Sequence, residues 1–177
     1  MIPATKTAVR PATAEDAPAI HSITQAAFKK LLSEPGSAKT LKALQETEED
    51  ILKDLGEKRV LMCEQDGGPV GSIRYHVVLG NIAYISRFGV LPEAQGRGIG
   101  GALIDAVAAE CRERGLRAMV LHTSSAVLSS MRFYYKMQFF VAGVCTDRGY
   151  YRAILVRELD RPGQIVDYAE LFKNSGL

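Results

Sequence analysis

Six consecutive residues near the middle of the chain, Gly96-Arg97-Gly98-Ile99-Gly100-Gly101, include four glycines. Glycine has no Cβ, so several backbone N–H groups can turn toward one point. The apolar residues that follow recur at helical spacing, which places the glycines at a helix N-terminus. The first N–H groups of a helix lack internal partners and carry the positive end of its dipole. The run therefore predicts an anion site suited to phosphate, to which Arg97 adds a charge-assisted contact.

Two common phosphate motifs do not fit this loop. The spacing Gly96-x-Gly98-x-x-Gly101 matches the dinucleotide fingerprint, but Leu91 to Gln95 separate the glycines from the preceding strand. The fingerprint also needs an acidic residue about 20 positions on. That region here reads Leu121-His122-Thr123-Ser124, with no carboxylate. A Walker loop is excluded as well, because no Gly-Lys-Ser/Thr follows the glycines.

The hydrophobic pattern around the loop predicts one mixed α/β domain over residues 1–160. Helical periodicity gives way to strand periodicity after Gly56 and returns after the loop, so a strand–helix–strand unit with one parallel pair follows an antiparallel meander. The fold class is α/β of the α+β type, with a mostly antiparallel sheet. We expect helices over 13–31, 39–55, 98–114 and 126–137, and strands over 7–10, 59–64, 70–79, 82–90, 118–123, 139–145 and 150–159.

Residues 161–177 form a separate tail after Arg161-Pro162-Gly163. Val166 to Phe172 has the pattern of a short helix. Three roles are open for it: packing on its own domain, docking on a partner subunit, or fraying. The second role makes a homodimer an expectation, since C2 dimers are the commonest oligomers.

Composition narrows the function classes. The chain has 177 residues, 47% of them apolar, and a formal charge of +2. That charge is too small to indicate nucleic-acid or anionic-membrane partners. Cys63, Cys111 and Cys145 are too far apart to indicate a disulfide framework or a metal site. The first residues contain no apolar signal region and no apolar run reaches ~20 residues, so we expect a cytoplasmic protein without a metal.

The run from Val90 to Leu103, Val-Leu-Pro-Glu-Ala-Gln-Gly-Arg-Gly-Ile-Gly-Gly-Ala-Leu, resembles the Val-x-Pro-x-x-Gln/Arg-Gly-x-Gly-Ile/Leu-Gly signature of the GNAT acetyltransferases. The resemblance implies that this loop binds the pyrophosphate of acetyl-CoA. It also implies that the backbone of Phe88, Gly89 and Val90 pairs with the pantetheine arm, and that the N–H near Val90 stabilises the oxyanion. The implied pyrophosphate residues are Gln95, Gly96, Arg97, Gly98, Ile99, Gly100 and Gly101.

A second segment, Phe133-Tyr134-Tyr135-Lys136-Met137-Gln138-Phe139, is similar to the family's Leu/Phe-Tyr-Glu-Lys-Leu-Gly-Phe segment. The resemblance makes Tyr134 the general acid toward the departing thiolate. It also implies that Tyr134 and the small residue four positions earlier, Ser130, bind the cofactor. Two positions depart from the family. Val127 replaces an asparagine, so a cofactor hydrogen bond is lost or rerouted. Gln138 replaces a glycine, so we expect the helix to close differently.

The resemblance spans roughly Val9 to Leu159, because Arg10 to Asp16 and Val70 to Ile73 are also similar to family segments. It implies a sheet splayed at its centre, with helices on both faces. Many members carry a glutamate base on the strand before the loop, and Ala83 to Arg87 offers none. The open alternatives are a water held by Tyr84 or Ser86, a backbone carbonyl, or His122.

Together these features predict direct transfer of an acetyl group from acetyl-CoA to a primary amine on a small molecule or peptide. Two other hypotheses use the same fold: an acyl-CoA sensor without turnover, and an interaction module without cofactor. Arg132 and Arg148 are candidates to meet an acidic acceptor. The acidic run Glu46 to Asp50 is a candidate to attract a cationic one.

Overall fold

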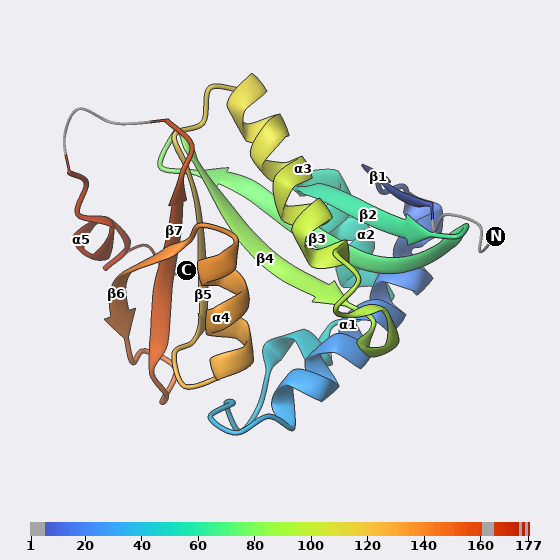
Figure 1. Ribbon diagram of the computed structural model, residues 1–177, viewed down its shortest axis with the longest axis horizontal. Coiled ribbons are helices and arrows are strands. Elements are labelled where there is room, and N and C mark those ends of the chain that lie inside the picture. Colours follow the sequence, from blue (N-terminus) through green and yellow to red (C-terminus); the bar gives the residue numbers. More distant parts are fainter. Residues whose placement is uncertain (1–5, 161–164, 174, 176) are drawn as a thin grey trace.

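A seven-stranded sheet runs through the part of the chain that the structure describes, with helices on both of its faces (Figure 1). This computed structural model describes residues 6–160, 165–173, 175 and 177. The strands are β1 (Thr7–Pro11), β2 (Arg59–Gln65), β3 (Gly68–Val78), β4 (Ile82–Val90), β5 (Ala118–Ser124), β6 (Phe140–Cys145) and β7 (Arg152–Glu158). The α-helices are α1 (Ala17–Leu32), α2 (Glu48–Glu57), α3 (Ile99–Glu113), α4 (Leu128–Lys136) and α5 (Tyr168–Phe172). Three short 3-10 helices are η1 (Ala14–Asp16), η2 (Lys42–Gln45) and η3 (Pro92–Ala94).

The strand order is β1-β2-β3-β4-β5-β7-β6, which confirms the predicted mixed sheet. Only β4 and β5 pair in parallel, across the crossover helix α3, and the other neighbours are antiparallel. The last two strands form the predicted hairpin, with β7 inserted between β5 and β6.

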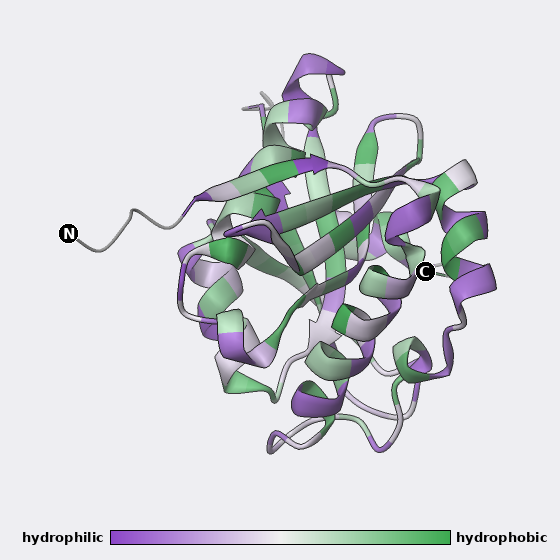
Figure 2. Cartoon of the chain, turned by 90° about the vertical axis from the view of Figure 1, so that its right-hand side faces the viewer, coloured by the Kyte–Doolittle hydropathy of each residue, from purple (hydrophilic) through white to green (hydrophobic). Residues whose placement is uncertain are grey.

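Alternation along the strands builds a core on each face of the sheet. Leu61 and Cys63 on β2 pack in the cluster under α3, whereas Val60 and Met62 pack with residues of α1 and α2. This is the period of two that a strand with both faces covered requires. In Figure 1, α3 and α4 lie in front of the sheet, and α1 and α2 lie behind it. Figure 2 shows the strands as largely apolar segments in the middle of the molecule.

The sheet opens at its centre, as the family resemblance implies. The β4–β5 ladder contains the pairs from Ile82 with Ala118 to Tyr84 with Val120, and β4 then continues to Val90. Figure 1 shows the two strands diverging toward their C-terminal ends. Backbone groups on the facing edges of the strands are therefore directed into the gap rather than toward each other.

A bulge in β4 lies beside this gap. The register against β3 shifts between Ser72 and Arg74, so that β4 contains one extra residue there. Arg87 takes a left-handed φ of 49°. The extra residue puts Phe88 on the same face as Ile85, where both pack in the cluster under α3 and α4. Strict alternation would have placed Phe88 on the opposite face.

The prediction of a helix over 39–55 is wrong for the first half of that range. The structure has the short η2 there, and α2 begins only at Glu48. The reason is the capping box at Thr47. Its hydroxyl accepts from the Asp50 N–H at 3.2 Å, and the Asp50 carboxylate accepts from the Thr47 N–H at 2.9 Å. Such a cap fixes a helix start, and Glu46 before it is extended. The helix also ends at Glu57, one residue after the expected terminator Gly56.

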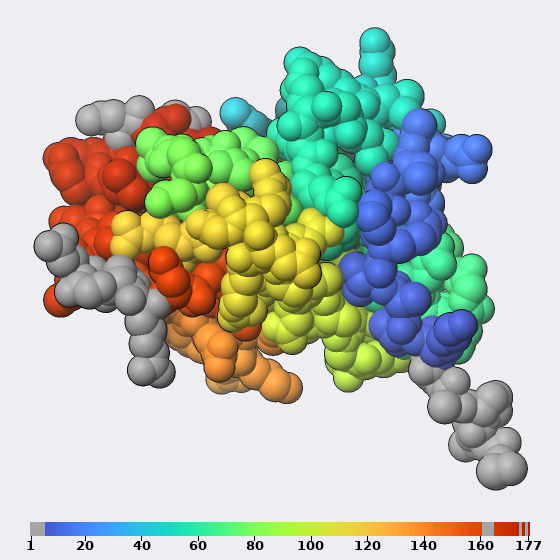
Figure 3. Space-filling view, turned by 90° about the horizontal axis from the view of Figure 1, so that it is seen from above, coloured from blue at the N-terminus to red at the C-terminus, as the bar shows by residue number. Residues whose placement is uncertain are grey.

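The C-terminal segment covers part of the face that α1 leaves open. Tyr168 and Phe172 of α5 are buried against Val120, Ile154 and neighbouring side chains. The Tyr168 hydroxyl also donates to Glu158 at 2.9 Å. The expected break at 161–163 and the first five residues lie outside the described residues, and the division at residue 160 stays a prediction. Figure 3 shows the red C-terminal segment and the blue N-terminal segment on opposite sides of the molecule.

Among the residues that the structure describes, no helix combines the length and the apolar character needed to cross a membrane.

Candidate active site

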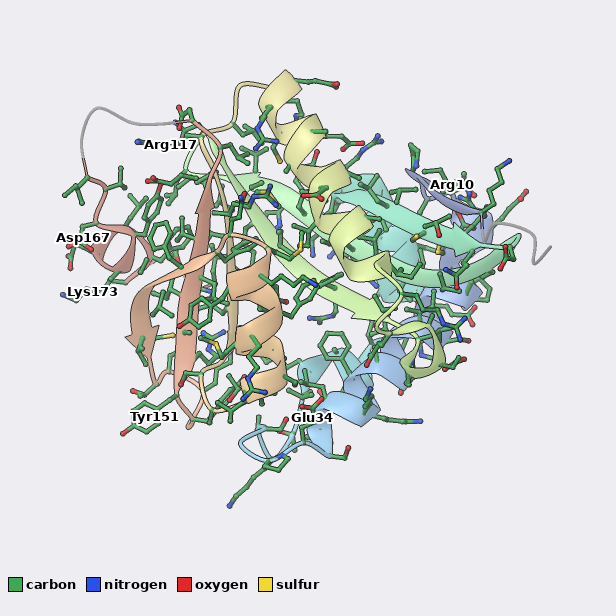
Figure 4. All side chains as sticks on the ribbon, viewed as in Figure 1. Arg10, Glu34, Arg117, Tyr151, Asp167 and Lys173 are labelled. Atoms are coloured by element: carbon green, nitrogen blue, oxygen red, sulfur yellow. The ribbon has the colours of Figure 1, made fainter. Side chains whose placement is uncertain are left out.

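A cleft of about 720 Å³ lies at the divergence of β4 and β5 and reaches both faces of the sheet. On the side of α3 and α4 it is lined by Phe88, Gly100, Ser130 and Tyr134. On the other side it is lined by Tyr84, Ser86, His122, Arg148 and residues of the α1–α2 connection. Figure 4 places Glu34, which follows α1, and Tyr151, which precedes β7, on opposite sides of the lower end of α4.

The predicted phosphate loop begins α3. Gly98 is the N-cap and has a left-handed φ of 83°, which glycine adopts without strain. A Cβ at Gly98 would meet no other atom within 4 Å, so the space beside the helix start is open. Gly96 and Gly100 line the cleft. Ile99 contributes only its backbone to this region, because its side chain is buried in the core. Arg97 is exposed, with its guanidinium 3.4 Å from the amide oxygen of Gln65.

Gln95 connects the loop to the end of β4. Its side-chain amide donates to the Val90 carbonyl at 3.1 Å, and its amide oxygen accepts from the Lys30 ammonium. Leu91, which follows Val90, donates its N–H to the Val70 carbonyl at 2.8 Å. Backbone groups of successive strand residues point to opposite edges, so the Val90 N–H is directed toward the gap between β4 and β5.

Lys30 is a cleft residue that sequence reasoning missed. It lies in the last turn of α1 and lines the cleft beside Gln95. The pattern of α1 marks Lys30 only as part of the exposed face. Its position depends on how α1 packs across the sheet, and no local signal carries that information.

Tyr134 lies where the cleft meets an aromatic cluster. Its ring centroid is 5.3 Å from that of Phe133, 5.5 Å from that of Phe139 and 6.3 Å from that of Phe88. Burial raises the pKa of the Tyr134 phenol above its ordinary value. The phenol is therefore protonated throughout the physiological range, which is the state that a proton donor requires.

Gly100 allows this cluster to close over the helix start. A Cβ at Gly100 would lie 3.1 Å from ring atoms of Phe133 and 3.3 Å from the ring of Phe88. The glycine thus serves a close approach of the aromatic rings, besides its place in the loop.

Tyr84 and His122 form the polar floor on the other side of the sheet. The Tyr84 hydroxyl lies 2.9 Å from His122 Nδ1. Burial, followed by the positive charge of Arg152, lowers the pKa of His122 to about 4. Burial also raises the pKa of Tyr84. Nearby, the buried Ser86 hydroxyl has no hydrogen-bond partner among the described residues.

A buried ionic network supports the α1–α2 connection. The Arg74 guanidinium is fully buried and donates to both carboxylate oxygens of Glu46 at 2.7 Å and to Asp54 at 2.8 Å. The Arg87 Nε donates to the same Glu46 carboxylate at 3.0 Å. Glu46 therefore anchors the segment that lines one wall of the cleft. Sequence reasoning treated Glu46 as part of an acidic run that is a candidate to attract a cationic acceptor, and missed this role.

The model of the acetyltransferase (GNAT) family matches residues 19–139. The match includes the glycine loop, the gap between β4 and β5, and Tyr134. The chain belongs to the GNAT acetyltransferase family. No curated protein matches it by sequence.

Solved GNAT structures share the fold at low sequence identity. PaiA N-acetyltransferase from Thermoplasma acidophilum, in complex with coenzyme A, aligns with a TM-score of 0.75 and 18% identity, over 86% of this chain and 99% of its own. The ribosomal-protein-S18-alanine N-acetyltransferase from Escherichia coli aligns with a TM-score of 0.70 and 20% identity, over 91% of this chain and 99% of its own. YncA from Salmonella typhimurium, with acetyl-CoA, aligns with a TM-score of 0.68 and 20% identity, over 91% of this chain and 98% of its own.

The two departures from the GNAT pattern have different outcomes. Gln138 takes a left-handed φ of 66°, and the Phe139 N–H donates to the Tyr134 carbonyl at 3.0 Å. The helix thus closes as a glycine would close it, and the expectation of a different closure is wrong. Val127 is buried at the start of α4, lines the cleft and offers no side-chain cap. The valine side chain has no hydrogen-bond donor or acceptor, so this position cannot make the side-chain hydrogen bond of an asparagine.

No group of three or more histidine, cysteine, aspartate or glutamate side chains suited to a metal ion occurs among the described residues of this GNAT protein.

Proposed function

We propose that this GNAT protein transfers the acetyl group of acetyl-CoA directly to a primary amine on a small molecule or peptide. The observation that carries the proposal is the path of the cleft. It joins the glycine loop at the start of α3 to the Tyr84–His122 pair on the opposite face of the sheet. Two substrates can therefore approach the gap between β4 and β5 from opposite sides.

The loop residues fit the pyrophosphate of acetyl-CoA. Gly96 and Gly98 have left-handed φ values, and a Cβ at either would meet no atom within 4 Å. The N-terminal N–H groups of α3 face this open space with the positive end of the helix dipole. Lys30 adds a positive charge beside Gln95. The proposal is also supported by two solved structures of the same fold, one in complex with coenzyme A and one with acetyl-CoA.

Acetyl-CoA supplies the acetyl group as a thioester. In the proposed reaction the amine nitrogen forms a bond to the carbonyl carbon, and the carbon–sulfur bond breaks. The Val90 N–H stabilises the negative charge that develops on the carbonyl oxygen. The Tyr134 hydroxyl lies on the α4 side of the gap and delivers a proton to the departing sulfur.

We propose His122 as the group that receives the amine proton. Its imidazole is neutral above a pH of about 4 and so has a nitrogen able to accept. In the proposed tautomer Nδ1 carries the proton and donates it to the Tyr84 hydroxyl oxygen at 2.9 Å, so Nε2 has the lone pair that accepts from the amine or from an intervening water. The Val90 carbonyl is a poorer candidate, because Gln95 already donates to it.

The acceptor class rests on the relatives and on the open side of the cleft. The Escherichia coli relative is named for an alanine of ribosomal protein S18, so the fold accommodates a peptide acceptor. The α1–α2 connection and the β6–β7 loop border the acceptor side here. The expected homodimer stays a prediction.

The proposal is tested by following thiol release from acetyl-CoA with a panel of primary amines. Thiol release that requires an amine, with the acetylated amine identified by mass spectrometry, supports it. Acetyl-CoA binding without turnover toward any amine contradicts it and favours a sensor. Absence of acetyl-CoA binding favours an interaction module.

A further inference from the structure

Among the residues that the structure describes, the charged side chains that line the cleft are almost all positive. They are Lys30, Lys42, Arg87, Arg148 and Arg152, against the single carboxylate of Glu34. Glu34 is engaged by the Ser129 hydroxyl at the start of α4. The protein as a whole has a formal charge of only +2, so the composition alone does not account for five positive side chains against one carboxylate in this lining.

Lys30 belongs to the coenzyme side, because it donates to Gln95 beside the phosphate loop. The three arginines belong to the other side. Arg87 and Arg152 lie on β4 and β7, and Arg148 lies in the loop between β6 and β7, next to the Tyr84–His122 pair. A phosphate at the start of α3 does not account for them, since the sheet lies between.

The arginines differ in how far neighbouring carboxylates neutralise them. Arg152 is buried and donates to both Asp147 oxygens, at 2.8 and 2.7 Å, so its charge is matched. The Arg87 Nε donates a hydrogen bond to the Glu46 carboxylate. Arg148 lies 3.9 Å from Asp147, a carboxylate already engaged by Arg152, and more than a third of its side chain is exposed. Arg148 is therefore the guanidinium best able to bind an incoming anion.

We propose that the acceptor of this protein is an amine that also carries a carboxylate, such as an amino acid or an acidic peptide, and that Arg148 binds that carboxylate. The inference rests on the proposed acetyl transfer and names the substrate class at the same site. The paired donors of a guanidinium match the two oxygens of a carboxylate. A carboxylate at Arg148 leaves the amine on the same molecule directed toward His122 and the gap.

The same charges disfavour a polycationic acceptor. A polyamine would bring several positive charges next to Arg87, Arg148 and Lys42, and like charges in a partly dehydrated cleft repel. The acidic run Glu46 to Asp50 does not offset this repulsion, because none of its residues is among those that line the cleft. Glu46 is in addition paired with Arg74 and Arg87.

The test compares matched acceptors at saturating acetyl-CoA. Alanine, leucine and phenylalanine are each assayed beside the corresponding C-terminal amide, with spermidine as the cationic probe. The amide has the lower amine pKa and is more often unprotonated at neutral pH. A preference for the free acid therefore cannot arise from amine basicity. We expect kcat/KM to be roughly 10- to 100-fold higher for the acids, the range for a hydrogen-bonded charge pair.

The variant Arg148→Gln identifies the residue, and Arg132→Gln is its matched control, because Arg132 is exposed on α4 and does not line the cleft. Arg148 lies in an exposed turn, so its replacement leaves the core intact. We expect Arg148→Gln to abolish the preference for acids by raising their KM, so that acids and amides are used about equally. Arg132→Gln should behave as the wild type.

Three outcomes separate the claims. A preference for acids that disappears in Arg148→Gln alone supports the inference. Equal use of acids and amides, or a preference for spermidine, overturns the inference and leaves acetyl transfer standing. Bound acetyl-CoA with no amine acetylated overturns both.

Discussion

The phenol oxygen of Tyr84 lies 2.9 Å from Nδ1 of His122, at the place where β4 and β5 separate. Tyr84 belongs to the last pair of the parallel ladder, and His122 lies two residues beyond its partner Val120. On the side of the C-terminal segment, the ring of Phe172 is centred 6.4 Å from Tyr84 and 6.3 Å from His122. The two polar groups are thus held at the edge of an apolar cluster and directed to the cleft.

This relationship predicts unequal effects of two substitutions. His122→Asn removes the proposed proton acceptor and should lower kcat by roughly 100-fold, a typical contribution of a general base. Tyr84→Phe removes only the group that orients the ring, so the loss should be about 10-fold. Steady-state kinetics with the best acceptor measures both, and acetyl-CoA affinity should not change. Wild-type turnover in His122→Asn would exclude the histidine and favour a water beside Ser86.

The depressed pKa of His122 also predicts a pH dependence of stability. The ordinary histidine pKa is about 6.5 in the unfolded chain, and the folded value is about 4. Between these values the unfolded state binds a proton that the folded state does not. The contribution of the neutral His122 to the free energy of unfolding should therefore be fully present above pH 6.5. It should decrease as the pH falls toward 4. Urea titrations from pH 4 to 7.5 should show a shallower slope for His122→Asn than for the wild type, and equal slopes would contradict the assignment.

Tyr134→Phe should lower kcat and leave acetyl-CoA affinity unchanged. The ring and its aromatic packing are retained, and only the proton donor is lost. We expect a decrease of about 100-fold. Tyr135→Phe is the matched control, because Tyr135 is adjacent in sequence and exposed to solvent. Equal losses in the two variants, or a loss of acetyl-CoA affinity in Tyr134→Phe, would count against the role of Tyr134.

Local patterns predicted most of the fold. The glycine loop, the capping box at Thr47, the antiparallel meander and the crossover helix each have short-range signals. Features that depend on tertiary packing have no such signal. The bulge at Arg87 follows from how β4 pairs with β3, and η2 replaces a helix because Thr47 starts a new one.

The same distinction holds for the site. The proposed pyrophosphate loop is contiguous in sequence, so its residues could be named from the sequence. The Tyr84–His122 pair spans 38 positions, and the Lys30–Gln95 contact spans 65. These pairs exist only after the sheet has formed. Sequence reasoning could name His122 as one alternative for the base and Tyr84 as a residue that could hold a water in that role, but could not place the two together.

The buried network around Arg74 predicts a large effect of one carboxylate. Glu46→Gln removes the negative charge that balances Arg74 and Arg87 and leaves the fully buried Arg74 with Asp54. Breaking a buried pair on one side is strongly unfavourable, and we expect a loss of about 3 kcal/mol in the free energy of unfolding. Urea denaturation measures it. Glu49→Gln is the control and should change the value by less than about 0.5 kcal/mol, because Glu49 is exposed.

The central claim is that the start of α3 binds the pyrophosphate of acetyl-CoA, and two glycines of this helix provide a matched test. Gly98 and Gly115 lie at its two ends with φ values of 83° and 68°, and a Cβ at either would meet no atom within 4 Å. Glutamate at either position therefore imposes a similar backbone strain, but only Gly98→Glu places a negative charge in the proposed phosphate site.

The measurement is calorimetric titration of acetyl-CoA into the wild type, Gly98→Glu and Gly115→Glu, each first shown to be folded by circular dichroism. We predict micromolar binding by the wild type and by Gly115→Glu, and its loss in Gly98→Glu. No binding by the folded wild type, or equal binding by all three proteins, would contradict the account.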